Sequence, residues 1–127
     1  HPLLATEMEK VRLPYNLPTA SQALAAAALG PLAPAIERHV AAIGRERTRL
    51  LDELRRVPGV FHGRTDANFV WLGLEGITGA ALAASLKARG VLVRNFPAHP
   101  DRIRVSVGTR AECDRFLEGL RESLGAR

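Results

Sequence analysis

VLVRNFPAHPDRIRVSVGT, residues 91–109, decides the fold, because it reads as two strands that lead directly into a helix. Residues 91–95 and 102–107 are rich in β-branched side chains, which favour strands. The intervening FPAHPD contains Pro97 and Pro100, and proline cannot donate a hydrogen bond to a sheet. The pattern therefore predicts a hairpin with a six-residue connection.

The second strand of this hairpin has two chemically different faces. Side chains alternate across a strand, which sets Ile103, Val105 and Val107 against Arg102, Arg104 and Ser106. Arg104 lies in mid-strand between β-branched residues, where a long cation is usually retained for a partner. With a suitable register, Arg94 at the end of the first strand lies on the same side. We therefore predict a two-arginine anion site.

The alternative for any one of these arginines is an ordinary solvated charge. The chain has 18 Lys and Arg residues, of which only Lys10 and Lys87 are lysines, so most of its arginines are expected at the surface. Arg94 departs less from this alternative than Arg104 does, because it lies at the end of its strand.

Length and composition bound the class of protein. The chain has 127 residues, 46% of them hydrophobic, which fits one ordinary domain with a core. It contains no apolar run long enough to cross a membrane and no signal-peptide pattern, so we expect no membrane partner and a cytoplasmic location. Its single cysteine, Cys113, cannot form an internal disulfide. The four histidines lack metal-ligand spacing, so no metal site is predicted.

The net charge of +5 raises the question of nucleic acid. Acidic residues are interleaved with the basic ones, as in RERTRLLDELRR at 45–56, which is typical of a solvated helix surface. Aromatic residues are only 5% of the chain, and we expect no paired exposed aromatics that could stack bases on the sheet. We therefore predict no nucleic-acid partner.

Four helices and four strands are expected, in the order ααββαββα. The helices are predicted over 20–29, 33–56, 79–89 and from 110 onward; the strands over 60–62, 68–74, 91–95 and 102–107. The strand at 68–74 is apolar on both faces, which predicts a central strand covered on both sides. The fold class is thus α+β, a small, mostly antiparallel sheet packed by helices.

Local signals mark the ends of these helices. Thr19 with Gln22 and Thr109 with Glu112 both match the capping box, and Thr78 can cap the helix that begins at Gly79. An apolar stripe is expected along the second helix, made of Ile36, Val40, Ile43, Leu50, Leu51 and Leu54. A second stripe follows Thr109, made of Cys113, Phe116, Leu117, Leu120 and Leu124, so Cys113 is expected to be a small core residue and not a nucleophile.

The chain as it stands carries no complete catalytic apparatus. It has no Ser/His/Asp or Cys/His set, no GxGxxG or GxxxxGK[ST] loop and no pair of carboxylates placed for perturbation by a core. The residues alone therefore indicate an anion site on an α+β module.

Several motifs together resemble one enzyme family. KVRLPYNLPTASQALAAAAL at 10–29, PGV and DANFVWL within 58–72, GVLVRNF at 90–96 and IRVSVGTRAECDRFLEGL at 103–120 look like the C-terminal third of the histidinol-phosphate aminotransferases. The resemblance implies a fold-type-I, pyridoxal-phosphate-dependent homodimer. Such enzymes exchange an amino group between histidinol phosphate and 2-oxoglutarate, with glutamate as the other partner, in histidine biosynthesis.

Site residues follow from this resemblance position by position. The arginine of RVSVGT, Arg104, matches the position that binds the substrate carboxylate, and the arginine of GVLVR, Arg94, matches one associated with the substrate phosphate. Tyr15 and Asn16 match a connector that approaches the neighbouring subunit's active site. Residues 1–30 would be the end of the large cofactor domain and its connector, and 31–127 the small domain.

The same resemblance implies that the cofactor is held elsewhere. None of the motifs of the cofactor-binding large domain occurs here, and neither Lys10 nor Lys87 is a suitable Schiff-base residue. The chain is expected to continue a protein begun upstream and to be inactive alone, with no catalytic or cofactor-binding residue of its own. Three alternatives remain: an aromatic-amino-acid aminotransferase of the same family, a free-standing module that binds an acidic metabolite, and a basic nucleic-acid-binding protein.

Overall fold

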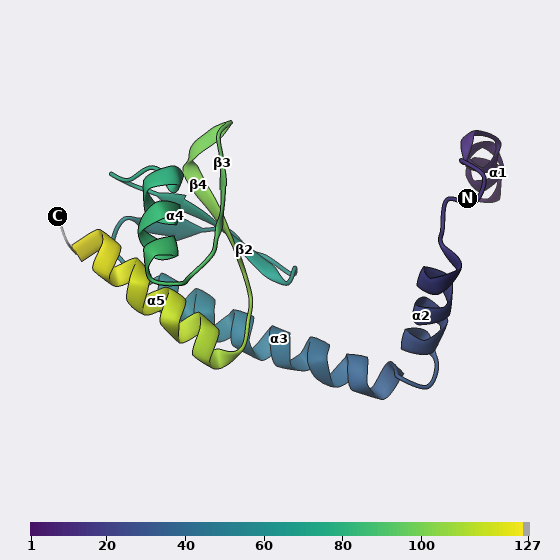
Figure 1. The fold of residues 1–127 in the computed structure, drawn as a ribbon, viewed down its shortest axis with the longest axis horizontal. Coiled ribbons are helices and arrows are strands. Elements are labelled where there is room, and N and C mark those ends of the chain that lie inside the picture. The colour runs from purple at the N-terminus through teal and green to yellow at the C-terminus, as the bar shows by residue number, and fades with distance from the viewer. Residues whose placement is uncertain (126–127) are drawn as a thin grey trace. The chain divides into compact units, whose positions relative to one another are not determined.

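The computed structural model describes residues 1–125 and divides the chain into two compact units. The first unit is His1–Arg38 and the second begins at His39, so the boundary lies inside the long helix α3, Ala33–Leu54. Each unit is described by itself below (Figure 1).

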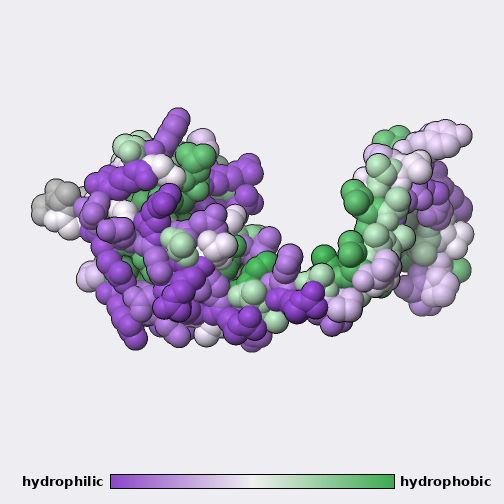
Figure 2. Space-filling view, turned by 60° about the horizontal axis from the view of Figure 1, so that its bottom comes forward, coloured by the Kyte–Doolittle hydropathy of each residue, from purple (hydrophilic) through white to green (hydrophobic). Residues whose placement is uncertain are grey.

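The N-terminal unit consists of α1 (Pro2–Val11), α2 (Thr19–Leu29) and the first residues of α3. Helix α1 was not predicted, so the expected order lacked one helix. It starts because Pro2 occupies the first turn and His1 Nδ1 accepts a hydrogen bond from the Leu3 backbone N–H at 3.3 Å. No residue of this unit is buried, and Figure 2 shows apolar residues at its surface.

The start of α2 differs from the prediction. The helix begins at Thr19 itself with Pro18 in the capping position, and no side chain caps it. Gln22 does not reach back to Thr19; its Nε2 donates to the Leu17 carbonyl at 2.9 Å. The capping box predicted here is wrong, because Pro18 already has a helix-compatible φ and the next residue can enter the helix directly. Gly30 ends the helix as predicted.

Helix α3 ends at Leu54, two residues before the predicted end. Only Leu50 and Leu54 of its expected apolar stripe are fully buried, while the side chains of Ile36 and Val40 are 43% and 63% exposed. The first half of the stripe therefore has no covering layer among the residues described. A helical period identifies an apolar face without saying what lies against it.

The second unit is built on one antiparallel sheet. Its strands, in the spatial order β1-β2-β4-β3, are β1 (Val60–His62), β2 (Phe69–Leu74), β4 (His99–Ser106) and β3 (Arg94–Phe96). Helices α4 (Gly79–Ala88) and α5 (Arg110–Gly125) complete it together with α3. The predicted α+β class is confirmed, and β2 lies inside the sheet as expected.

The hairpin that decides the fold is tighter than predicted. Pro97 and Ala98 alone join β3 to β4, and residues 91–93 do not pair, so the six-residue connection is wrong. Pro100 is tolerated inside β4 because pairing with β2 begins only at Arg102. A bulge between Asn95 and Phe96 shifts the register and lets the chain turn early.

One core holds the second unit together, and it lies on one face of the sheet. Its buried members come from β2, β4 and the three helices: Leu50, Leu54, Val57, Val70, Leu72, Leu74, Leu82, Leu86, Ile103, Val105, Val107, Cys113, Phe116, Leu117 and Leu120. Helix α4 approaches closely, since a Cβ at Gly79 would lie 2.4 Å from the Arg102 carbonyl oxygen. We call this side of the sheet the inner face.

The opposite side, the outer face, is not covered by a helix of the second unit as described. Phe69 and Trp71 point there and are only half-buried, whereas Val70 and Leu72 on the inner face have no exposed surface. The expectation that β2 is covered on both sides is therefore wrong. Its outer aromatic side chains are shielded by neighbouring side chains on the sheet instead.

The caps of the last two helices agree with the sequence. Thr78 Oγ1 accepts from the Ala81 N–H at 3.2 Å, and Gly90 adopts a φ of 76°, which ends α4. The capping box before α5 is present, with the Thr109 N–H donating to Glu112 at 2.7 Å. This cap fixes the start of α5 directly after β4.

Over residues 1–125, no single helix is long and apolar enough to cross a membrane. The bent pair α2 and α3 meets that test when both are taken together, on length and composition alone.

Candidate anion-binding site

The outer face gathers arginine and aromatic side chains from four strands. By register and contact, these are Phe61, Phe69, Trp71, Arg94, Phe96, Arg102 and Arg104. β-strand alternation forces this composition, because the same strands send their aliphatic residues to the inner face.

Arg94 and Arg104 are direct cross-strand partners in the β3–β4 ladder. Directly opposed residues point to the same side of a sheet with their Cβ atoms about 5 Å apart, so the two side chains are neighbours. Arg104 is also the direct cross-strand partner of Trp71 in β2, the strand that pairs with the other edge of β4. The structure therefore brings together the two arginines that the sequence singled out.

Neither arginine of this pair has an acidic partner. Among residues 1–125 no salt bridge or hydrogen bond involves the guanidinium of Arg94 or Arg104, whereas Arg102 on the same face pairs with Asp101 at 3.2 Å. Two opposed like charges destabilise a sheet, and an anion placed between them relieves that repulsion. The arrangement suits a carboxylate or phosphate ligand, which arginine grips through charge-assisted hydrogen bonds.

Each arginine of the outer face lies over a phenylalanine ring. The Cζ atom is 5.3 Å from the ring centroid in the Arg104–Phe69 pair, 5.2 Å in Arg94–Phe96 and 4.8 Å in Arg102–Phe61. These distances are within the range of cation–π interaction, about 6 Å.

Further aromatic side chains lie next to the Arg94–Phe96 pair. The ring of Trp71 meets that of Phe96 at 4.7 Å and that of His99 at 5.9 Å, both edge to face. The rings of Trp71 and Phe96 are half-buried against each other. Parity within β2 places Phe69 and Trp71 on one face, but the contact with Phe96 depends on the pairing of three strands.

Tyr15 and Asn16 belong to the N-terminal unit. Tyr15 is 99% exposed and has a φ of 54°, a left-handed conformation that is uncommon for a residue with a large side chain. Asn16 Oδ1 accepts a hydrogen bond from Arg12 Nη1 at 3.1 Å. The turn at 15–16 is thus held in an unusual backbone conformation, with the tyrosine ring free to contact another molecule.

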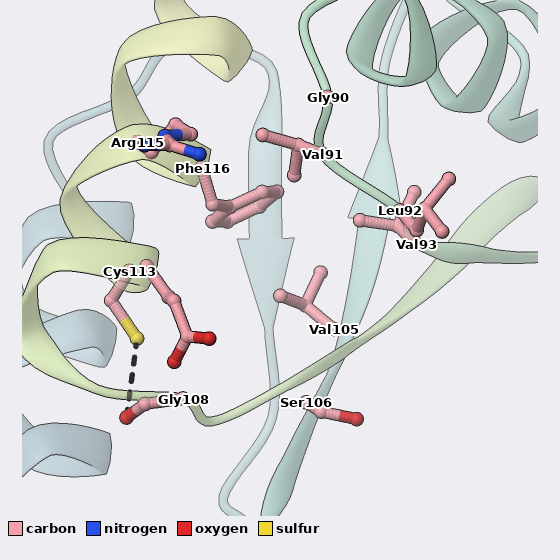
Figure 3. Close-up of a pocket in the computed structure, with 11 residues that line it drawn as sticks. Gly90, Val91, Leu92, Val93, Val105, Ser106, Gly108, Cys113, Arg115 and Phe116 are labelled. Atoms are coloured by element: carbon pink, nitrogen blue, oxygen red, sulfur yellow. Dashed lines mark hydrogen bonds between the residues drawn. The ribbon is translucent and has the colours of Figure 1, made fainter.

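A pocket of about 310 Å³ lies between α5 and the segment 90–93, at the end of β4 (Figure 3). Two of its polar groups are already engaged: Cys113 Sγ lies 3.9 Å from the Gly108 carbonyl, and Glu112 accepts the hydrogen bonds of the capping box. Neither Arg94 nor Arg104 lines it. This pocket is therefore distinct from the arginine pair.

Two pKa shifts near this pocket follow from structure. Burial raises the pKa of the Cys113 thiol, so the thiol stays protonated at neutral pH, as fits a core residue. Hydrogen bonds from Thr109 lower the pKa of Glu112, because they favour its charged form. Both groups serve the fold of α5.

Among residues 1–125, the two lysines do not stand where the residues could hold pyridoxal phosphate. A site for this cofactor needs a lysine amine for the Schiff base and a cradle for the phosphate. Lys10 lies exposed on α1 and pairs with Glu7 at 2.6 Å, and Lys87 is exposed in the last turn of α4. Neither stands in a pocket described for this structure.

The described part of the second unit is thus an α+β unit with helices on one face of the sheet and, on the other, an arginine pair without an acidic partner. The chain belongs to the family of aminotransferases of class I and II, whose model matches residues 2–120.

Similar proteins share one name. The chain is 39% identical to histidinol-phosphate aminotransferase 2 of Bordetella parapertussis, over 99% of this chain and 36% of that enzyme. It is 38% identical to the histidinol-phosphate aminotransferase of Streptomyces avermitilis, over 96% of this chain and 32% of that enzyme. The chain thus spans about a third of the length of these relatives.

Solved structures support the same fold. The histidinol-phosphate aminotransferase of Clostridium acetobutylicum matches with a TM-score of 0.77 and 25% identity, over 97% of this chain and 38% of that one. The enzyme of Sinorhizobium meliloti, solved with pyridoxal-5'-phosphate, matches with a TM-score of 0.70 and 22% identity, over 98% of this chain and 35% of that one.

Proposed function

We propose that this chain is the substrate-binding part of a pyridoxal-phosphate-dependent aminotransferase that transfers an amino group from histidinol phosphate to 2-oxoglutarate, forming glutamate. The observation that carries the proposal is the arginine pair, Arg94 and Arg104, opposed on the outer face without an acidic partner among the residues described. The family and the names of the relatives supply the reaction. In this proposal residues 31–127 act as the small domain and 1–30 as the end of a cofactor domain with its connector.

Within this proposal, Arg104 binds a carboxylate of the reactants that carry one, 2-oxoglutarate and its product glutamate. It is half-buried between Trp71 and Arg94, and a partly shielded guanidinium holds an anion more strongly than a fully solvated one. Two parallel N–H···O bonds fix a carboxylate in position and orientation, which matters for a reaction at the adjacent carbon.

Arg94 binds the phosphate of the amino donor. It is exposed at the first residue of the short edge strand β3, where a bulkier anion has access. A phosphate offers several oxygens to a guanidinium. The two arginines thus provide a half-buried position for a carboxylate and an exposed position for a phosphate.

The cofactor and the second subunit belong to the proposal as partners outside these residues. Pyridoxal phosphate serves as an electron sink when bound, and we assign it to a domain that supplies the lysine this chain lacks. The protein acts as a homodimer, and the exposed Tyr15 with its neighbour Asn16 approaches the active site of the second subunit.

A chimera tests the assignment of Arg104. The chain replaces the matching segment of the Bordetella parapertussis enzyme, and kcat/KM is measured for both histidinol phosphate and 2-oxoglutarate. Arg104→Ala is expected to lower kcat/KM for 2-oxoglutarate about 100-fold or more, the scale of losing a charge-paired contact worth about 3 kcal/mol. Arg102→Ala is the matched control, since Arg102 lies on the same face and already pairs with Asp101. Near-normal kinetics of Arg104→Ala in an active chimera would contradict the assignment.

Arg94 is tested by comparing donors. Arg94→Ala should weaken the use of histidinol phosphate much more than that of phenylalanine, because only the former carries a phosphate. Equal losses of kcat/KM for both donors would show that Arg94 is an ordinary surface charge and not a phosphate ligand. A chimera that prefers phenylalanine over histidinol phosphate would identify an aromatic-amino-acid aminotransferase instead.

The isolated 127-residue chain is expected to be inert. Mixed with pyridoxal phosphate, it should show no saturable, stoichiometric binding at micromolar concentration and no transamination. Slow, unsaturable Schiff-base absorbance from exposed Lys10 or Lys87 is compatible with this expectation. Stoichiometric binding with turnover would place a cofactor site within these residues and overturn the proposal.

A further inference from the structure

We infer that Phe69 is a positioning residue: its ring holds the guanidinium of Arg104 ready for an anion. The inference rests on the proposed function, in which Arg104 grips the substrate carboxylate. The ring itself touches no substrate in this account and acts only through the arginine.

The register explains how the two side chains meet. Arg104 is directly opposite Trp71, and Phe69 is opposite Ser106, so Phe69 is the diagonal neighbour of Arg104 across the β2–β4 ladder. Long and aromatic side chains reach such diagonal neighbours. The Arg104 Cζ atom lies 5.3 Å from the Phe69 ring centroid, within range of cation–π attraction.

Arg104 needs such a contact because nothing else among the described residues holds its charged end. It has no salt bridge and no side-chain hydrogen bond there. A free arginine side chain occupies many rotamers, and a ligand must then select one. A ring beneath the guanidinium reduces that freedom and leaves its N–H groups available, which neither a carboxylate nor a carbonyl partner would do.

The other two arginines of the outer face provide built-in comparisons. Arg102 lies 4.8 Å from the Phe61 ring centroid, but Asp101 also holds it at 3.2 Å. Phe61 is therefore a matched control, an aromatic residue on the same face whose arginine has a second partner. Arg94 and Arg104, in contrast, are each held by one phenylalanine ring and by no salt bridge or hydrogen bond of the guanidinium among residues 1–125.

The first test uses the 127-residue chain itself, by NMR of arginine side chains. In the unaltered chain, nuclear Overhauser contacts should join the Phe69 ring protons to the Arg104 δ protons, and ring currents should shift the Arg104 signals. Phe69→Leu should move the Arg104 Nε–Hε signal to the position of a mobile arginine and leave Arg102 unchanged. Phe61→Leu should affect Arg102 only. Absence of the contact in the unaltered chain overturns the inference without any variant.

The second test uses the chimera. Phe69→Leu is expected to lower kcat/KM for 2-oxoglutarate about 3- to 30-fold, the range of a cation–π contact converted to a rate. Phe69→Tyr, which keeps a ring beneath the guanidinium, should stay within about twofold of the parent, as should Phe61→Leu. Thermal unfolding of each variant separates positioning from loss of fold. Equal damage by Phe69→Tyr and Phe69→Leu, or none by Phe69→Leu, overturns the inference.

The two tests separate this inference from the proposed function. If the NMR contact is present and Phe69→Leu releases Arg104, but Arg104→Ala keeps normal kinetics, then Phe69 positions an arginine that does not bind substrate, and the proposed function fails. If Arg104→Ala abolishes activity while Phe69→Leu changes neither the signal nor kcat/KM, the proposed function stands and the positioning role of Phe69 is wrong.

Discussion

The interactions within the N-terminal unit differ in kind from those within the second unit. The N-terminal unit has no buried residue, and its ion pairs, Lys10–Glu7 and Arg12–Glu9, join residues three apart on or beside one helix. The second unit has a core of fifteen buried residues. Besides local ion pairs it has pairs that join separate helices: Arg49–Asp114 at 2.7 Å and Arg121–Glu53 at 2.6 Å join α3 to α5.

This difference shows that helix formation and tertiary stability are separate properties. Alanine-rich α2 is helical through local propensity, whereas α5 is helical because its apolar stripe is buried in the core. Exposed local ion pairs add little to stability, about 0.5 kcal/mol each. We therefore expect mutations of the same kind to have unequal effects in the two units.

The largest contrast should come from deleting a leucine side chain. Leu72 on β2 has no exposed surface, and Leu72→Ala should lower the free energy of unfolding by about 2–5 kcal/mol. Leu24→Ala in α2, where the leucine is 70% exposed, should change it by less than about 0.5 kcal/mol. Urea unfolding followed by fluorescence of Trp71, the one tryptophan, measures the second unit, and far-UV circular dichroism also reports on the helices of the N-terminal unit. Equal losses would show that the N-terminal unit has a core after all.

Acid should act on the tertiary ion pairs of the second unit. Hydrogen bonds from Arg49 hold the pKa of Glu46 below its ordinary value of 4.5, and Arg49 also pairs with Asp114. Because the folded-state pKa is the lower one, Glu46 stabilises the fold above pH 4.5 and loses this contribution as the pH falls through its folded pKa.

Glu46→Gln tests this pH dependence. The variant should be less stable by about 1.5 kcal/mol at pH 7 and should lose less stability on acidification than the parent, because it lacks the titrating carboxylate. Urea midpoints between pH 7 and pH 3 measure the difference. Parallel pH profiles for the parent and the variant would remove Glu46 from the acid response.

Substitution of a glycine on the outer face should lower the free energy of unfolding by a smaller amount. A Cβ at Gly73 would lie 2.0 Å from the Phe61 ring, so Gly73→Ala must displace that ring. The ring is partly exposed and can swing outward, so we expect a loss of about 1 kcal/mol, the low end for overpacking. The double variant Gly73→Ala, Phe61→Ala should show no further clash, and additive losses would argue against contact.

The smallest expected change is a gain in stability. Gly44 lies inside α3, and a Cβ there would meet nothing within 4 Å. Gly44→Ala should therefore raise the free energy of unfolding by about 0.5–1 kcal/mol through helix propensity alone. Gly30→Ala in the N-terminal unit is the comparison, because its Cβ would lie 3.0 Å from the Ala26 carbonyl. Thermal unfolding measures both; a loss for Gly44→Ala would reveal strain in α3.

Features encoded within one segment could be predicted from the sequence. The inner face of β4, with Ile103 and Val105, follows from alternation alone, and the Thr109–Glu112 capping box needs only residues three apart. The parity that placed Arg94 beside Arg104 also used local information, together with the assumption of a register that the structure provides.

Features that depend on residues distant in the sequence could not be predicted. The contact of Arg104 with Phe69 needs the β2–β4 register, which joins segments more than thirty residues apart and has no local signal. The exposure of Ile36 and Val40 depends on what covers α3, and periodicity is silent on that. Helix α1 was missed because its start rests on His1 and Pro2, outside the usual capping pattern.

The short edge strands have a consequence for behaviour at high concentration. β1 and β3 are each three residues long; β3 contains the bulge between Asn95 and Phe96 and is followed by Pro97. Unpaired strand edges recruit other chains into intermolecular sheets, and brevity, irregularity, proline and positive charge all oppose this. Arg94 on β3 therefore serves the solubility of the folded unit as well as any ligand: it stands at the border where a second sheet would otherwise add on.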